Sequence, residues 1–277
     1  MLAAATLAWP LLLGMAMLML GNGLQGTLLG VRATSAGFTP GVTGLVMAGY
    51  FAGFFAGSLL APPAIASVGH LRVFAALTAF GSAAILVHSV FVEPWLWGAM
   101  RLVTGFSYAG IFIVAESWLN ERVTNEHRGG LLSVYMIVTY LGMGGGQLLL
   151  NVADPAAHEL FMLISVLVSL ASVPILLTVT QQPEHTRAAR LGPGELFRVS
   201  RLGTLGSLAV GVGQGALFAM GAVYGRGIGL SIPQVSLLMA VIMDRDRISA
   251  LSGESSATST RPARCFRSSA TPATARS

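Results

Sequence analysis

Long apolar stretches separated by short polar gaps constrain the fold of this sequence more than any other feature. An α-helix needs about 20 mostly apolar residues to cross the roughly 30 Å hydrocarbon layer of a membrane. Windows of this kind occupy residues 7–30, 41–64, 71–92, 95–118, 130–152, 159–180 and 205–228. An eighth begins at Pro233 and stops near Met243. The sequence therefore predicts an all-α protein that crosses a membrane several times.

The low charge content supports the same prediction. Of the 277 residues, 54% are hydrophobic and only 10% are charged, whereas soluble domains carry about a quarter charged residues. The net charge of +5 does not indicate nucleic-acid binding, because all 16 basic residues are Arg and they form no stripe with interleaved aromatic residues. The single Cys265 excludes a disulfide framework and a thiolate metal site. We expect a lipid bilayer as partner, and no nucleic acid.

The distribution of arginine predicts the orientation, because cytoplasmic loops of membrane proteins are enriched in Lys and Arg. With a cytoplasmic N-terminus, only Arg32 and Arg226 fall outside. The inside loops then hold Arg72, Arg122, Arg128, Arg187, Arg190, Arg198 and Arg201. The sequence predicts that the N-terminus is cytoplasmic.

The windows divide the chain into two membrane units. Residues 1–180 form a six-helix bundle, 181–204 a cytoplasmic linker rich in Pro, Gly and Arg, and 205–243 the start of a second bundle. A shift of 192 positions aligns Gly21-Asn22-Gly23 with Gly213-Gln214-Gly215. A parallel repeat that opens after six helices is what a duplicated transporter predicts.

Residues 244–277 differ from the rest of the chain. Four charges from Asp244 to Arg247 stand where the eighth helix should continue, and each would cost a few kcal/mol in the bilayer. The following segment is rich in Ser, Ala, Thr and Arg, and we expect it to be disordered. One hypothesis is a shift of reading frame near Met243, which would truncate the protein. The other is a genuine basic tail that ends an eight-helix protein.

Two segments carry a family resemblance. Arg101-Leu-Val-Thr-Gly105-Phe-Ser-Tyr-Ala109 resembles the fourth-helix motif of the major facilitator superfamily. Glu116-Ser117-Trp118-Leu119-Asn120, followed by Arg128-Gly129, is similar to the YcaD-like bacterial branch of that superfamily. The resemblance covers residues 1 to about 243. It implies the N-terminal half of a facilitator fold, plus helix seven and part of helix eight, in a bacterial inner membrane.

The loop after the second helix is a degenerate match to the signature loop of the superfamily. The match runs from Gly57 to Arg72, and Ala61 and Pro62 replace the usual Asp and Arg. The resemblance implies an inner gate in which Glu116 pairs with Arg72, Arg122 or Arg128; an interfacial carboxylate that reaches headgroup water is the alternative interpretation.

Arg101 is the most informative polar residue. A guanidinium at membrane depth costs about 2.5–3.5 kcal/mol on insertion scales, so it should face the bundle interior or a cavity. It could attract an anionic substrate or join a proton relay, or it could hydrogen-bond carbonyls of a neighbouring helix. Amide and hydroxyl side chains in other helices are predicted to share this cavity, with interhelical hydrogen bonding as the alternative. These side chains are Asn22, Gln25, Tyr140, Gln147 and Gln214.

Glycines at four-residue spacing mark close helix packing, because a glycine face admits a neighbouring backbone. They are Gly49, Gly53 and Gly57 in the second helix, Gly105 in the fourth, and Gly142 and Gly146 in the fifth. In the resembled fold, helices two and five face the other half of the molecule and slide. We therefore interpret these faces as moving surfaces.

The sequence has no phosphate-binding glycine loop and no hydrolase or metalloprotease motif, so we expect neither an enzyme, nor a metal site, nor a cofactor. The leading hypothesis is a secondary active transporter of small organic solutes by alternating access, incomplete as this chain. The alternative is a non-transporting membrane scaffold or binding subunit that needs a second half.

Overall fold

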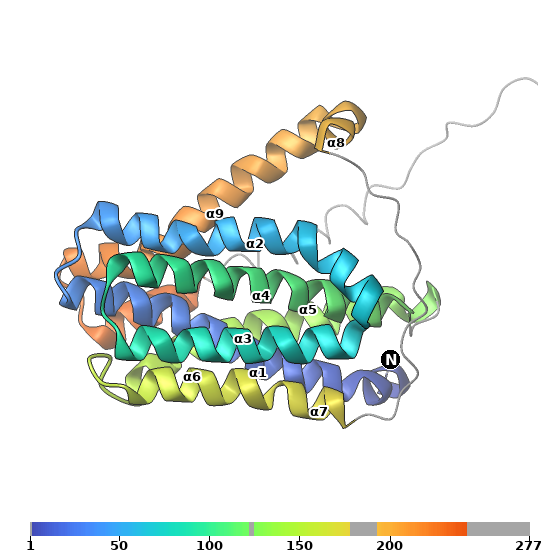
Figure 1. Cartoon of the computed structure of the whole chain (residues 1–277), viewed down its shortest axis with the longest axis horizontal. Helices are drawn as coiled ribbons and strands as arrows, with labels where there is room; N and C mark the ends of the chain where they lie inside the picture. The colour runs from blue at the N-terminus through green and yellow to red at the C-terminus, as the bar shows by residue number, and fades with distance from the viewer. Residues whose placement is uncertain (1, 122–124, 178–192, 243–277) are drawn as a thin grey trace, which may run out of the picture.

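The computed structural model describes residues 2–121, 125–177 and 193–242, with the backbone only for residues 2–8, 121, 125–128, 193 and 196. Every regular element in this part of the chain is a helix (Figure 1). The elements are α1 (Leu2–Ser35), α2 (Pro40–Val68), α3 (His70–Val90), α4 (Pro94–Glu121), α5 (Asn125–Leu148), η1 (Leu149–Asn151), α6 (Glu159–Leu170), α7 (Ser172–Leu176), α8 (Pro193–Val199), α9 (Arg201–Gly227) and the short helix Ile232–Ile242.

Seven spans in the described part of the chain are long and apolar enough to cross a membrane, which confirms the predicted fold class. The spans are Trp9–Ser35, Pro40–Val68, His70–Val90, Pro94–Asn120, Gly129–Asn151, Glu159–Leu176 and Arg201–Gly227. Helices α2 and α4 begin at Pro40 and Pro94, where the missing proline N–H removes no helical hydrogen bond.

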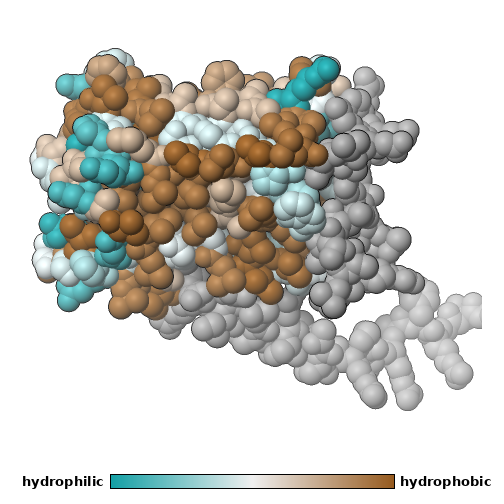
Figure 2. All heavy atoms as spheres, turned by 90° about the horizontal axis from the view of Figure 1, so that it is seen from below, coloured by the Kyte–Doolittle hydropathy of each residue, from teal (hydrophilic) through white to brown (hydrophobic). Residues whose placement is uncertain are grey.

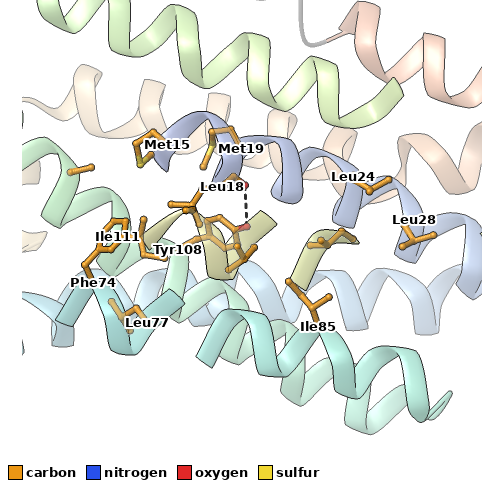
Figure 3. Packing of buried hydrophobic residues seen from close by; sticks show 14 of the residues in the cluster. Met15, Leu18, Met19, Leu24, Leu28, Phe74, Leu77, Ile85, Tyr108 and Ile111 are labelled. Atoms are coloured by element: carbon orange, nitrogen blue, oxygen red, sulfur yellow. Dashed lines mark hydrogen bonds between the residues drawn. The ribbon is translucent and has the colours of Figure 1, made fainter. Parts of the chain in front are cut away.

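Helix α1 is the most enclosed of these spans. Its span is 61% buried, whereas that of α9 is only 11% buried. Met15, Leu18 and Met19 of α1 are fully buried; Leu18 lies beside Tyr108 of α4 (Figure 3), whereas Met19 faces Gly142 of α5. In the same region the Tyr108 hydroxyl donates to the Leu18 carbonyl at 3.2 Å, which joins α4 to α1. The first bundle is therefore organised around α1.

Glycine faces bring α2 against α4, and the two helices lie side by side along much of their length (Figure 1). A Cβ on Gly49 would stand 2.7 Å from the Gly98 carbonyl oxygen, and one on Gly57 would stand 2.6 Å from that of Phe106. Gly53 and Gly105 approach the facing backbone more closely still. No side chain fits at these contacts without moving a helix.

The fifth-helix glycines pack in the same way, within the same bundle. Gly142 faces Met19 of α1, where an added Cβ would lie 2.7 Å from the Met19 Cβ, and Gly146 faces the Leu20 carbonyl. The interpretation of the α2 and α5 glycine faces as surfaces that slide against the other half is therefore wrong. Their partners are α4 and α1, because backbone contact this close lets neighbouring helices of one bundle interlock.

The predicted loop after the second helix is almost entirely helical. Helix α2 continues through Pro62 and Pro63 to Val68, and Gly69 alone separates it from α3. Gly69 has φ +98°, a conformation that residues with a Cβ rarely adopt, and this permits the abrupt turn. Because a proline removes one helical N–H, α2 bends near the prolines (Figure 1). Ala61 and Pro62 are thus helical residues.

The second membrane unit begins earlier than predicted. Ser200 caps α9 by accepting a hydrogen bond from the Gly203 amide at 3.1 Å, so the helix starts at Arg201 instead of residue 205. The short helix α8 occupies part of the predicted linker. Residues 178–180 at the end of the predicted first bundle, 181–192 of the predicted linker, Met243 and the predicted tail, 244–277, lie outside the described residues.

The outer surface of the bundle is apolar. Leu45, Phe55, Phe80 and Val90 are each more than 60% exposed, with values of 76%, 68%, 61% and 67%. Figure 2 shows hydrophobic residues over the middle of one face, with hydrophilic residues gathered at one end. An apolar belt of this extent is not compatible with water and is typical of contact with lipid.

The fold predicts that Arg72 and Asp154 lie on opposite sides of the membrane. Arg72 is in the first turn of α3, whereas the loop that holds Asp154 is tied to the other end of α3 by a 2.7 Å hydrogen bond between Ser89 and His158. We expect Arg72→Cys and Asp154→Cys, each in a Cys265→Ser background, to react with a membrane-impermeant maleimide from opposite sides. Labelling of both from one side would contradict this arrangement.

Candidate functional site

A cavity of about 310 Å³ lies between the first bundle and α9. Its walls come from helices α1, α2, α4, α5 and α9 and from the short helix. The lining residues are Asn22, Gly23, Gly26, Thr27, Tyr50, Phe51, Arg101, Met143, Gln147, Gly211, Gln214, Gly215, Phe218, Ala219 and Met239. Glycines make room for it, since nothing lies within 4 Å of a Cβ added at Gly26 or Gly211.

Arg101 supplies the charge of the cavity. It lies seven residues after Pro94, about 10 Å along α4, and only 6% of it is exposed. Its guanidinium carbon stands 4.5 Å from the centre of the Tyr50 ring, a cation–π contact. Its Nε has no hydrogen-bond partner among the described residues, and none of the lining residues is acidic. The site is therefore a buried cation without a carboxylate partner in its walls.

Neutral hydrogen bonds hold the other polar walls in place. The Thr27 hydroxyl donates to the side-chain carbonyl of Gln147, which connects α1 with α5. Ser236, on the short helix, donates to the Gln147 backbone carbonyl at 2.7 Å. These bonds fix the cavity shape across both membrane units.

Four of the six predicted cavity residues line this cavity: Asn22, Arg101, Gln147 and Gln214. The shift of 192 positions aligned Asn22 with Gln214, and both residues line the same cavity. Gln25 and Tyr140 do not line it.

Helical geometry explains both differences. The α1 face turned to the cavity runs from Asn22 through Gly26 to Thr27, so Gln25 falls on the far side of Asn22 and is buried with 1% exposure. Tyr140 lies on the same side of α5 as Gln147 but two turns along, about 10 Å from its level. Sequence spacing identified the face of α5 but not the depth.

Several lining residues escaped prediction from sequence. Thr27, Tyr50, Phe51 and Phe218 lie in apolar windows and carry no local signal that separates them from packing residues. The sequence around Tyr50 does not mark it as a site residue, because its place in the site depends on a contact with Arg101 of a different helix. The position of Tyr50 beside the glycine run of α2 is the one weak signal in the sequence.

The predicted gate is only partly within the described side chains. Arg72 and Glu116 are both exposed, and no ion pair joins them. Arg128 is described by its backbone in α5, and Arg122 lies outside the described residues. The gate therefore stays a prediction.

Helix α9 approaches the first bundle along only part of its length. A Cβ on Gly30 of α1 would lie 3.2 Å from Ala222, and one on Gly215 would lie 3.2 Å from the Phe51 ring. Around Gly206 and Gly213, earlier in α9, no atoms lie within 4 Å of such a Cβ. A second space of about 540 Å³ opens there between α2 and α9. Figure 1 shows this end of α9 turned away from the bundle.

These features define the class: a polytopic α-helical membrane protein with a solute-sized cavity, lined in part by a buried arginine, between two helical units. The Major Facilitator Superfamily model matches residues 11–243, and the chain belongs to this family. The family resemblance seen in the sequence is thereby confirmed. This is a family of transporters and not of enzymes, in agreement with the expectation from the missing catalytic motifs.

The curated relatives that the chain matches are named as MFS-type transporters. The chain is 29% identical over 235 residues to the uncharacterized MFS-type transporter Ent638_1421 of Enterobacter sp. strain 638, covering 84% of this chain and 62% of the relative. It is 29% identical over 202 residues to the MFS-type transporter YcaD of Escherichia fergusonii, covering 72% of this chain and 53% of that protein. The chain thus spans between half and two thirds of the length of these relatives.

A solved structure has the same fold. The nucleoside transporter NupG, as its D323A mutant, superposes with a TM-score of 0.72 at 14% sequence identity. The superposition covers 91% of this chain and 68% of that structure. It supports the facilitator architecture of the described helices.

Proposed function

We propose that this chain is part of a secondary active transporter that moves small organic solutes across a bacterial inner membrane by alternating access. The observation that carries the proposal is the cavity between the first bundle and α9, which holds the buried cation Arg101 inside an apolar, lipid-facing protein. Sites of this family type lie near the midplane between two repeats. The bacterial relatives and the arginine distribution support an inner-membrane location with a cytoplasmic N-terminus.

The unequal approach of α9 supports alternating access. Contacts of Gly215 and Ala222 with the first bundle join the second half of α9 to α2 and α1. Toward Ser207 the helices separate, which leaves the cavity side open at the end where the N-terminus lies. We infer an inward-open arrangement, from which closure of α9 against α2 would reverse the access.

We further propose that transport requires more helices than this chain describes. The repeat aligns α9 with α1, yet the α1 span is 61% buried and the α9 span is 11% buried. A complete second bundle would cover α9 as the first bundle covers α1. Without these partners the far wall of the cavity would consist of α9 and one short helix.

Reconstitution into liposomes tests both proposals. We expect no solute flux from the chain alone, and flux when it is co-expressed with the part of Ent638_1421 outside the matched region. The solutes should include nucleosides, because NupG is named for them, and aromatic acids. The control replaces this chain by a Gly53→Leu variant, in which the first bundle cannot close.

The outcomes separate the hypotheses. Robust flux from the chain alone would remove the requirement for a second half. Binding of solutes without flux in either preparation would favour the alternative of a binding subunit or scaffold.

A further inference from the structure

We propose that the Arg101 cavity binds a small organic solute with one singly charged anionic group, a carboxylate or a phosphodiester, attached to an apolar body. This inference deepens the proposed transport function and rests on it for physiological meaning. The binding site itself is argued from the geometry of the cavity.

Arg101 gives the cavity an uncompensated positive charge. Arg101 is only 6% exposed, so its guanidinium has lost most of its hydration, and the ring of Tyr50 replaces only part of it. The lining residues include no carboxylate and no second cation. One anionic group on the ligand would therefore neutralise the cavity, and two would leave an unpaired buried charge.

The guanidinium of Arg101 donates hydrogen bonds in fixed directions. Its planar fork matches a carboxylate or a phosphate with two parallel hydrogen bonds, which no neutral group reproduces. The Nε hydrogen is available for such a bond, because it has no partner among the described residues. Arg101 is the one lining residue with a positive charge, so it is the group that would hold the ligand head.

Much of the remaining cavity wall is aromatic or apolar. Phe51, Phe218 and Met239 offer aromatic and apolar surface opposite the polar helices. A volume of about 310 Å³ lies at the small end of ligand pockets, which span roughly 300–1,000 Å³. The site therefore suits a compact aromatic or branched monoanion better than a sugar or a long amphipathic drug.

Benzoate and benzamide provide a matched test, because they share shape and differ in charge. The full chain is purified in detergent, and ligand binding is measured by thermal stabilisation and by calorimetry. We expect benzoate to bind about tenfold to hundredfold more tightly than benzamide, the range for hydrogen bonds to a charged group. The Arg101→Gln variant should lose this preference, and the Arg198→Gln variant should keep it, since Arg198 is exposed on α8 outside the cavity.

The lipid composition of the membrane distinguishes a lipid phosphate from a free solute as the source of the anion. In nanodiscs, competition between phosphatidylglycerol and benzoate that depends on Arg101 would assign the site to a lipid phosphate; equal benzoate affinity in phosphatidylglycerol and phosphatidylcholine would assign it to a free solute. If Arg101→Gln does not fold, Arg101→Lys replaces it and should weaken benzoate while keeping some preference over benzamide.

Equal affinity for benzoate and benzamide, or a preference that survives Arg101→Gln, would overturn the inference. Neither result depends on flux, so the transport proposal would stand. Conversely, a clear anion preference without flux in the complemented liposomes would sink the transport proposal and leave the anion site intact.

Discussion

Replacement of Gly53 by alanine is expected to destabilise the first bundle more than any other single methyl addition on α2. The added Cβ would fall inside contact distance of the Leu102 backbone carbonyl, and backbone atoms cannot rotate away as a side chain can. Either α2 must move from α4 or the Gly105–Tyr50 contact on the same seam must open. Overpacking costs about 1–3 kcal/mol and occasionally more. We expect a value at the upper end for alanine and loss of folded protein for leucine.

Gly41 provides the matched control. It lies on the same helix, and nothing is found within 4 Å of a Cβ added there. Gly41→Ala should leave the melting temperature unchanged or raise it slightly, because alanine favours helix over glycine. Fluorescence-detected size-exclusion chromatography after heating measures both variants. Equal melting temperatures would show that α2 and α4 are not packed as closely as described.

Replacement of Arg101 by methionine is expected to stabilise the ligand-free protein while it abolishes anion binding. A buried guanidinium costs about 2.5–3.5 kcal/mol on insertion scales, and the Tyr50 contact returns about 0.5–2 kcal/mol. Methionine has a similar length, no charge and good packing flexibility. A gain of about 1 kcal/mol or more should appear as a higher melting temperature in detergent without added anions.

The sign of this effect separates two roles for Arg101. If Arg101 holds neighbouring helices together through hydrogen bonds, Arg101→Met removes these bonds and lowers the melting temperature. If Arg101 instead serves to bind a ligand, its unpaired buried charge destabilises the protein when no ligand is bound. Benzoate should stabilise the original protein and leave Arg101→Met unaffected. Thr104→Val, on the same helix, is the control, since the Thr104 hydroxyl bonds only its own helix at the Arg101 carbonyl at 2.9 Å.

Partner identity limited what could be predicted about the site. The spacing of Asn22 and Gln25 fits one helix face, yet the boundary between cavity and core passes between them. The glycines of α2 were identified as a close-packing face, but α4 as their partner follows only from the assembled bundle. Tyr50 became a site residue through a contact with α4 that its own segment does not encode.

By itself, the sequence determined the membrane-spanning helices, the facilitator family and the depth of Arg101. These depend on local properties: the length of apolar runs, motif spacing and the cost of charge in hydrocarbon. Only the tertiary structure decided which helices the glycines join, that α2 runs through its prolines to Gly69, and which polar side chains meet Arg101. Those outcomes depend on the rotation and depth of each helix relative to its neighbours, and such relations exist only once the helices pack.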